Sequence, residues 1–424
     1  MTKVAVGMSG GVDSAVAAYL LKEQGYDVVG VTLRTFGSGD EDGLGGSSRC
    51  CEIDDARAAA EKIGIPYHVF NVSSEFERKI VAPFVQSYCS GTTPNPCVIC
   101  NRVLKWEHMM YAAKVLGAEK IATGHYASIV RLENGRYTVR TAEHAAKDQS
   151  YMLYRLSQEQ LAATLMPLGS YSKEQARKIA AEIGLEIAGK PDSQEICFVP
   201  DDDYAGFIKR WIERKGGAEP SWQAVGTAAA GGATKCAAQQ GGLEAEKPVE
   251  TADPFAEGNF VDAEGRVLGC HRGIVNYTVG QRKGLGIALG YPAYVLKIDP
   301  ARNQVVLGPQ EALFTDTVRL QDVSFMGIEG LKTGERVKVF AKIRYQHPAA
   351  EAVLAPAEPE SGAAEQENAA ASEDAVKQGQ NGLRMEDPAE AILCFKKPVK
   401  AAAPGQSAVF YDSDGRVLGG GIIQ

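Results

Sequence analysis

The stretch that most constrains the fold of this 424-residue chain is residues 7–14, with the sequence G-M-S-G-G-V-D-S. The apolar run at residues 4–6 precedes it and is typical of a buried strand, whereas residues 15–24 have the apolar spacing of a helix that ends before Gly25. A glycine-rich turn between a strand and a helix presents backbone N–H groups and the positive end of the helix dipole to an anion. The sequence therefore predicts a phosphate-binding loop at the start of the chain.

The loop lacks the Gly-Lys-[Ser/Thr] ending of a Walker A site, which excludes that class. The hydroxyls of Ser9 and Ser14 can add hydrogen bonds to a bound anion. Asp13 can help to position a magnesium ion, or it can satisfy a backbone N–H group at the start of the helix. A simple tight turn is the structural alternative, but the full string after a strand favours a functional loop.

The first half of the chain alternates strand-like and helix-like segments. Strands are predicted at residues 27–33, 67–72 and 120–123, and helices at residues 51–63, 74–88, 97–116 and 172–183. The last helix begins with a capping box from Ser172 to Gln175. Such alternation predicts a parallel sheet covered on both faces, with ligands at the carboxyl ends of its strands. Residues 7–14 and 123–125 both lie at such ends.

The second half differs in composition. Residues 216–257 are rich in Gly, Ala, Gln and Glu and are typical of a flexible insertion. Strand-like alternation resumes after residue 259, and short β-rich runs from residue 318 onward predict a small barrel. Residues 355–382 interrupt this barrel with Ala, Glu, Gln and Ser, and we expect them to be disordered.

Composition excludes some function classes. No apolar run approaches the ~20 residues of a membrane helix, and the N-terminal strand leads directly into the loop, so we expect no membrane span and no signal peptide. Nine cysteines favour a reducing cytoplasm and reactive rather than structural thiols. The net charge of −8 equals the charge of residues 351–390, which contain ten acidic and two basic residues. The rest of the chain is formally neutral, so a nucleic-acid partner is not excluded.

The second informative stretch is residues 93–101, T-P-N-P-C-V-I-C-N. The cysteines lie near a predicted helix start, where the dipole favours a thiolate. A zinc site would need a second Cys/His pair, but Cys50 and Cys51 are adjacent rather than spaced, and a thioredoxin-like dithiol is typical of a much shorter chain. The third interpretation is a catalytic thiol with a sulfur partner. Cys197, in D-S-Q-E-I-C-F-V, is the candidate partner, although most cysteines are inert buried thiols.

Three further motifs complete the pattern: T-G-H-Y-A at residues 123–127, K-D-Q-S-Y at 147–151, and N-Y-T-V-G-Q-R-K-G-L-G-I at 276–287. With these motifs in this order, the sequence resembles the bacterial tRNA-specific 2-thiouridylases of the PP-loop ATP pyrophosphatase superfamily. The resemblance covers the chain from Lys3 to its end, apart from the two insertions.

The resemblance implies an α/β fold in three parts. A PP-loop (adenine nucleotide alpha-hydrolase-like) parallel-sheet domain is expected at residues 1–206, a small central domain at 207–311, and a C-terminal β-barrel at 312–424. The two insertions are departures from the family pattern, and they leave the tRNA-facing surface of the second half undefined.

The resemblance also implies an activity: ATP-dependent replacement of the C2 oxygen of the wobble uridine (position 34) of tRNA by sulfur. The products are 2-thiouridine, AMP and pyrophosphate, formed through an adenylated intermediate with the help of Mg²⁺. The residues that match the family's ATP-binding positions are Gly7, Met8, Ser9, Gly10, Gly11, Val12, Asp13, Ser14, Leu33 and Gly124.

Two cysteines match the family's catalytic positions. Cys100 corresponds to the nucleophile and Cys197 to the cysteine that carries the persulfide, so that the reaction ends with a Cys100–Cys197 disulfide. The position of Cys97 is aspartate in some relatives, and its thiol is therefore not expected to be catalytic. The residues that match tRNA-contacting segments are Asn95, Pro96, Cys97, Lys147, Asp148, Gln149, Arg344 and Tyr345.

The expected partners are the anticodon loop of tRNA and a persulfide donor, such as a cysteine desulfurase or a sulfur relay protein, and we expect a cytoplasmic monomer. His125 is equally consistent with a substrate contact and with a satisfied histidine after a strand. One alternative function is a PP-loop enzyme that adenylates a small molecule, but such an enzyme does not need two reactive cysteines. A zinc-containing RNA-binding module is the other alternative.

Overall fold

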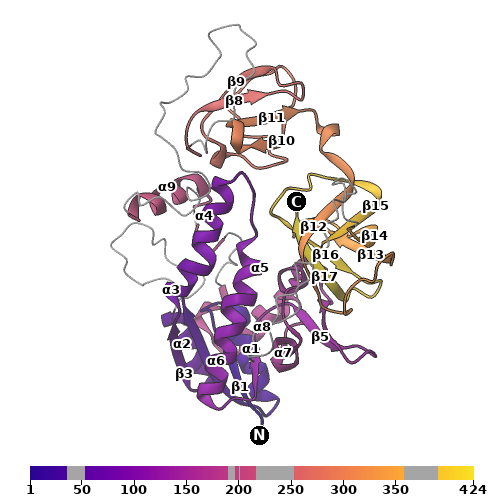
Figure 1. Ribbon diagram of the computed structural model, residues 1–424. Coiled ribbons are helices and arrows are strands. Elements are labelled where there is room, and N and C mark those ends of the chain that lie inside the picture. The colour runs from indigo at the N-terminus through magenta and orange to yellow at the C-terminus, as the bar shows by residue number, and fades with distance from the viewer. Residues whose placement is uncertain (36–52, 190–195, 200, 216–252, 358–389) are drawn as a thin grey trace, which may run out of the picture.

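The computed structural model describes residues 1–35, 53–189, 196–199, 201–215, 253–357 and 390–424. The adjacent Cys50 and Cys51 and most of both predicted insertions lie outside the described residues. Within the described part of the chain, three large β-structures follow one another (Figure 1), besides one two-stranded hairpin. They are a parallel sheet, a four-stranded sheet and a closed barrel.

The first sheet has five parallel strands in the order β3-β2-β1-β4-β7. These strands are β1 (Lys3–Gly7), β2 (Asp27–Arg34), β3 (Tyr67–Asn71), β4 (Lys120–Ala122) and β7 (Thr164–Leu165). Val6 of β1 lies opposite Gly30 of β2 on one side and Ala122 of β4 on the other. The predicted parallel sheet is therefore confirmed, and β1 leads from its centre into the glycine-rich loop.

Helices cover both faces of this sheet, as the alternation of strands and helices predicted. Side chains alternate between the two faces of a strand. Val4 and Val6 join the core beneath α1 (Val12–Glu23), α2 (Ile53–Ile63) and α8 (Lys173–Glu182). Ala5 joins the opposite core, which contains residues of α4 (Ala82–Cys89) and α6 (Glu107–Leu116).

Two long helices that the sequence predicted as regular contain π-helical segments. The first runs through α3 (Ser73–Phe76), η1 (Glu77–Val81) and α4, and the second through α5 (Pro96–Cys100), η2 (Asn101–Trp106) and α6. Pro83 lies in the first turn of α4, close after the π-helical segment.

The remaining elements of the first half are short. They are the hairpin β5 (Ala127–Arg131) and β6 (Tyr137–Thr141), the helices α7 (Gln158–Ala163) and α9 (Tyr204–Arg214), and the 3-10 turns η3 (Ala145–Lys147), η4 (Ser150–Leu153) and η5 (Glu186–Gly189). The hairpin was not predicted, although it follows directly after the motif T-G-H-Y-A.

The second sheet is ordered β10-β11-β8-β9. Its strands are β8 (Gly258–Val261), β9 (Val267–His271), β10 (Tyr294–Asp299) and β11 (Gln304–Gly308), with the 3-10 turns η8 (Ile274–Asn276), η9 (Pro300–Arg302) and η10 (Gln310–Leu313). Cys270 on β9 is in a disulfide, so the prediction of reactive rather than structural thiols is wrong at that position.

The predicted C-terminal barrel is confirmed as six strands that close in the order β12-β15-β14-β13-β16-β17. They are β12 (Phe314–Phe325), β13 (Val337–Lys342), β14 (Ala350–Pro356), β15 (Ala391–Lys400), β16 (Ser407–Tyr411) and β17 (Val417–Ile423). Ala355 and Pro356 pair with Ile392 and Ala391. The expected disorder from residue 355 is therefore wrong for the first two residues, because the β14–β15 ladder continues through them.

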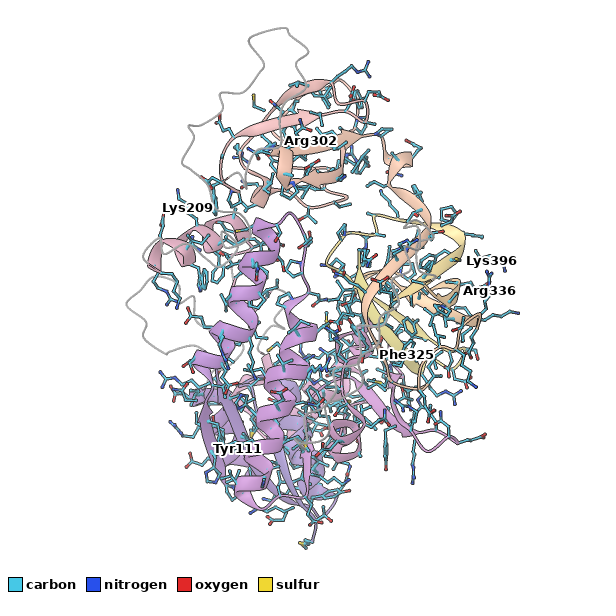
Figure 2. The ribbon with its side chains drawn as sticks, viewed as in Figure 1. Tyr111, Lys209, Arg302, Phe325, Arg336 and Lys396 are labelled. Atoms are coloured by element: carbon cyan, nitrogen blue, oxygen red, sulfur yellow. The ribbon has the colours of Figure 1, made fainter. Side chains whose placement is uncertain are left out.

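The barrel packs against the hairpin β5–β6 of the first half (Figure 1). Arg136 donates from Nε to the carbonyl of Met326 at 2.9 Å, and the Met326 side chain is buried in the same core as Val139 of β6. Figure 2 shows Arg336 and Lys396 on the other side of the barrel, away from α5. Among the helices in the described ranges, none is long and apolar enough to cross a membrane.

Candidate functional site

The predicted ATP-binding residues come from three neighbouring strands of the parallel sheet. Strands β2, β1 and β4 are adjacent, and at their carboxyl ends they carry Leu33, Gly7 and, two residues past the end of β4, Gly124. The structure therefore brings these residues to one edge of the sheet. This edge is where parallel α/β sheets bind ligands.

The loop after β1 is held by its own hydrogen bonds. Gly10 has a φ of +73°, a conformation that favours glycine. The Ser14 hydroxyl donates to the carbonyl of Gly11 at 3.0 Å and accepts from the Ser9 N–H group at 3.1 Å. The hydroxyl of buried Ser14 therefore shapes the loop from within, whereas Ser9 is exposed and its hydroxyl can face an anion.

Met8 and Val12, on either side of the Ser9-Gly10-Gly11 segment, anchor the loop in the sheet and core. The Met8 N–H group donates to the carbonyl of Val31 at 2.8 Å, and the Thr32 hydroxyl donates to the carbonyl of Met8 at 2.6 Å. Val12 is buried at the first position of α1. The start of the loop is thereby fixed to β2, and its end is fixed in the core.

Gly124 packs directly against the start of α1. A Cβ atom at this position would lie 2.6 Å from the carbonyl carbon of Asp13 and 2.7 Å from the backbone nitrogen of Ser14. Real Cβ atoms do not approach backbone atoms so closely, and backbone atoms cannot rotate away as a side chain can. Glycine at this position therefore allows the strand β4 and the loop to meet.

Asp13 does not cap its helix. The N-cap of α1 is Gly11, without a side-chain hydrogen bond, so the expected helix-start role of Asp13 is not seen. Instead, its carboxylate accepts hydrogen bonds from Lys173 at 2.8 Å to each oxygen and from the Tyr126 hydroxyl at 2.6 Å. Among the residues that the structure describes, no cluster of three or more His, Cys, Asp or Glu could hold a metal ion.

Residues 93–101, which contain Cys97 and Cys100, include the start of α5. The Asn95 side chain accepts from the Val98 N–H group at 3.4 Å and so caps this helix, Pro96 is its first residue, and Cys97 follows half-buried. Cys100 lies one turn further and is only 6% exposed. The prediction that a helix starts close to the cysteines is confirmed, and it gives the two thiols different exposures.

Cys197 lies in a short described segment, residues 196–199, that is anchored by an aromatic cluster. The Phe198 ring packs edge-on against the rings of Phe84 and Phe76, with ring centroids 5.0 Å and 5.7 Å apart. Cys100 belongs to the same apolar core, and Cys197 packs against it half-buried. The structure therefore places both predicted catalytic cysteines on one core, across 97 residues of sequence.

The K-D-Q-S-Y motif packs inside the protein more than its polarity suggests. Asp148 is 6% exposed, and its carboxylate accepts from the N–H groups of Ala142 and Ser150 and from the Ser150 hydroxyl. Gln149 accepts from the N–H group of Tyr126 at 3.0 Å. Lys147 is half-buried at the end of η3.

The second predicted RNA segment lies beside this motif. Arg344 and Tyr345 lie in the turn after β13, where Arg344 is exposed and Tyr345 is half-buried. The Tyr345 hydroxyl donates to the carbonyl of Asp148 at 3.0 Å, and its ring packs against Tyr151. The barrel and the first domain therefore contribute predicted RNA-contacting residues to one place.

The loop ahead of Cys97 is also held by the barrel. Gln406 donates from Nε2 to the carbonyl of Thr93 at 2.9 Å, and the Thr93 N–H group donates to the carbonyl of Pro404 at 2.9 Å. Tyr151 donates its hydroxyl proton to the carbonyl of Ser407 at 2.7 Å. The barrel thus supports the two segments that the sequence assigned to tRNA contact in the first domain.

His125 is held as a neutral ring. Burial, together with the smaller effect of the nearby positive charge of Lys105, lowers its pKa to about 3. Its Nδ1 lies 2.9 Å from the Thr123 hydroxyl, and its ring packs against Trp106. These contacts fit the interpretation of His125 as a histidine after a strand whose polar ring atom is satisfied within the protein.

Sequence reasoning missed two residues of the site, Tyr126 and Lys173. Tyr126 is part of the motif T-G-H-Y-A, so its position next to the loop had a signal in the sequence. Lys173 lies inside the predicted capping box of α8, and no local pattern connects it with Asp13, which is 160 residues away.

A parallel sheet with an S-G-G-V-D-S loop at its carboxyl edge, followed by two β-structures, defines a PP-loop enzyme with accessory β domains. Three family models match: the tRNA methyl transferase HUP domain at residues 2–201, the tRNA methyl transferase PRC-barrel domain at 247–309, and the aminomethyltransferase beta-barrel domain at 375–423.

Full-length relatives make the assignment specific. A tRNA-specific 2-thiouridylase MnmA of Lachnoclostridium phytofermentans is 43% identical over 426 residues, covering 100% of this chain and 99% of the relative. The protein of the same name from Clostridium acetobutylicum is 42% identical over 430 residues, with 100% and 99% covered. This chain belongs to the family of tRNA-specific 2-thiouridylases.

Proposed function

We propose that this protein uses ATP to replace the C2 oxygen of the wobble uridine of tRNA by sulfur. The products are 2-thiouridine, AMP and pyrophosphate. The observation that supports the proposal is that one domain holds both the glycine-rich loop at the carboxyl edge of its sheet and two cysteine thiols on a common core. A PP-loop enzyme that adenylates a small molecule would need the loop but not the two cysteines.

The loop serves the first step, in which the uridine C2 oxygen attacks the α-phosphorus of ATP and pyrophosphate leaves. The leaving group carries several negative charges, and backbone N–H groups at the start of α1 and the exposed Ser9 hydroxyl can receive it. The departing oxygen is then part of AMP, which is a far better leaving group than the unmodified oxygen. A magnesium ion would assist by neutralising phosphate charge.

The cysteines serve the second step. The terminal sulfur of a persulfide on Cys197 attacks the activated C2 carbon, and the oxygen departs with AMP. The Cys100 thiolate then attacks the inner sulfur, which releases the thiolated uridine and leaves a Cys100–Cys197 disulfide. An external thiol reduces this disulfide with two electrons, and a persulfide donor, such as a cysteine desulfurase or a sulfur relay protein, reloads Cys197.

The tRNA surface in this proposal combines two parts of the chain. Asn95, Pro96 and Cys97 begin the helix of Cys100, and Lys147 and Arg344 add positive charge from the two sides of the Tyr345–Asp148 contact. Tyr345 offers an aromatic face for a base. A wobble base must be turned out of the anticodon loop to reach Cys100, which is 6% exposed.

The test is a reaction with purified protein, an unmodified tRNA transcript, ATP and a cysteine desulfurase with cysteine. We expect one AMP and one pyrophosphate for each 2-thiouridine, measured by nucleoside mass spectrometry and nucleotide chromatography. Release of ADP and phosphate would contradict the adenylation step. AMP formation from a small molecule in place of tRNA would support the alternative PP-loop function.

A further inference from the structure

Lys173 is a buried cation next to the glycine-rich loop. It is the first residue of α8 and is 6% exposed, although lysine is rarely buried unless it is paired. Its Nζ atom lies 2.8 Å from each carboxylate oxygen of Asp13, in the first turn of α1. The Tyr126 hydroxyl, on buried Tyr126, donates to the same carboxylate. The loop aspartate is therefore held from two sides by elements outside the loop.

The exposures of the two charged partners differ. The Asp13 side chain is 32% exposed, whereas the Lys173 side chain is 7% exposed. The carboxylate therefore faces the solvent side of the loop, and the ammonium group lies behind it. Lys173 is therefore placed to act on a ligand through Asp13 rather than by direct contact.

A carboxylate at this position opposes anion binding unless it is neutralised. The N-terminus of a helix carries the equivalent of roughly half a positive charge. A full negative charge on Asp13, in the first turn of α1, would more than cancel that charge and repel a phosphate. The paired charge of Lys173 restores the balance, and the pair as a whole leaves the helix dipole available to the anion.

The position of Lys173 is fixed by its own helix. Ser172 accepts from the Gln175 N–H group, and the Gln175 side chain accepts from the Ser172 N–H group, so the start of α8 is closed by a reciprocal cap. Helix α8 packs on α1 in the same core. The ammonium group is therefore presented to Asp13 by a rigid element.

We propose that Lys173 is a positioning residue for ATP binding. Its ammonium group neutralises and orients Asp13, so that the loop can accept the phosphates of ATP. The inference rests on the proposed ATP use of the loop. Nothing in the sequence of the loop itself identifies Lys173, because the residue lies 160 positions further along the chain.

The test measures ATP affinity by isothermal titration calorimetry in buffer with EDTA, so that any metal-binding role of Asp13 does not enter. The variants are Lys173→Met, the double variant Asp13→Asn/Lys173→Met, and the control Lys178→Met. Lys178 lies on the same helix, but its side chain is 77% exposed and pairs with Glu182. Folding is checked by circular dichroism and by binding of an anticodon stem-loop RNA. If Lys173→Met does not fold, Lys173→Gln replaces it with the same expectation.

We expect Lys173→Met to weaken ATP binding about tenfold or more, because it leaves Asp13 uncompensated. The ATP affinity of the double variant should recover to within about threefold of the wild-type value, since both charges are gone. The ATP affinity of Lys178→Met should match that of the wild type. Equal weakening in the single and double variants, or none in Lys173→Met, would overturn the inference while the wild type still binds ATP. A wild type that does not bind ATP would overturn the proposed function, and this inference with it.

Discussion

The hydroxyl of Tyr345 donates a hydrogen bond to the backbone carbonyl of Asp148 at 3.0 Å, across 197 residues of sequence. Lys342, in the strand just before, places its ammonium group 3.6 Å from the Asp148 carboxylate. The turn after β13 of the barrel is thereby joined to the K-D-Q-S-Y motif of the PP-loop domain. The proposed RNA surface is thus shared by two domains, and its geometry depends on the contact between them.

The first prediction concerns this contact. Tyr345→Phe keeps the ring against Tyr151 but removes the hydrogen bond, which should lower the free energy of unfolding by about 1 kcal/mol. We expect the KM for tRNA to rise a few-fold and the KM for ATP to stay unchanged, because only the RNA segments lose their alignment. The matched control is Tyr111→Phe on α6, whose side chain is exposed (Figure 2). Equal effects of the two substitutions on the KM for tRNA would contradict the prediction.

The second prediction concerns the approach of Gly124 to the loop. Gly124→Ala places a Cβ atom within 2.8 Å of three backbone atoms of Asp13 and Ser14, so the loop or strand β4 must shift. We expect a stability loss of about 1–3 kcal/mol and an ATP affinity reduced about tenfold. The control is Gly330→Ala in the barrel, where the nearest atom would be 4.0 Å away. The prediction fails if calorimetry gives the wild-type ATP affinity for a folded Gly124→Ala protein.

Much of the fold could be predicted from the sequence, because the patterns that predict it are local. The strand before the glycines, the capping box at Ser172 and Gln175, and the helix start beside Cys97 depend on neighbouring residues, and the structure contains all three. The π-helical segments were missed because their apolar spacing differs little from that of an α-helix over one turn. The hairpin β5–β6 was missed although it follows a motif.

The unpredicted part of the site depends on long-range pairing. Lys173 reaches Asp13, and Tyr345 reaches Asp148, through the packing of whole elements. Neither pair leaves a trace in local spacing or composition. The buried Asp148 carboxylate, which organises the turn around Ser150, was likewise not predicted. The RNA contact that the family resemblance implies for Asp148 stays a prediction.

The third prediction concerns the anchor between the first domain and the barrel. Arg155 is 5% exposed and pairs with the carboxylate of Asp322, and it also donates to the Asp322 carbonyl at 3.0 Å. Arg155→Ala should lower the free energy of unfolding by about 2 kcal/mol, less than for a fully buried pair because Asp322 is half exposed. In the control, Arg302→Ala, the side chain is 71% exposed and pairs with Asp299, so we expect a loss below about 0.5 kcal/mol (Figure 2). Urea unfolding followed by tryptophan fluorescence measures the free energy of unfolding of both variants. Equal losses in Arg155→Ala and Arg302→Ala would contradict the account.

The fourth prediction concerns pH. The pKa of His125 is about 3 in the folded protein, below its ordinary value of 6.5, because burial disfavours the charged ring. Between these values the unfolded chain binds a proton that the folded protein does not, so stability falls as the pH drops below about 6.5. At pH 5 this histidine should cost about 2 kcal/mol relative to pH 7.5.

His125→Gln should remove that part of the pH dependence. The measurement is the free energy of unfolding in urea at pH 5 and pH 7.5. The control is His68→Gln on the exposed face of β3, which should retain the wild-type difference. A wild-type difference that persists in full in His125→Gln would show that other groups cause it.

The roles of the cysteines give the most direct test of the proposed function. The measurement is mass spectrometry of tRNA nucleosides from cells that lack this protein and carry wild type, Cys100→Ser, Cys197→Ser or Cys97→Ser. Serine neither carries nor resolves a persulfide, so Cys100→Ser and Cys197→Ser should give no 2-thiouridine. The wild type should restore it in full, and Cys97→Ser should retain a substantial part. Full 2-thiouridine with Cys197→Ser, or none with Cys97→Ser alone, would contradict the account.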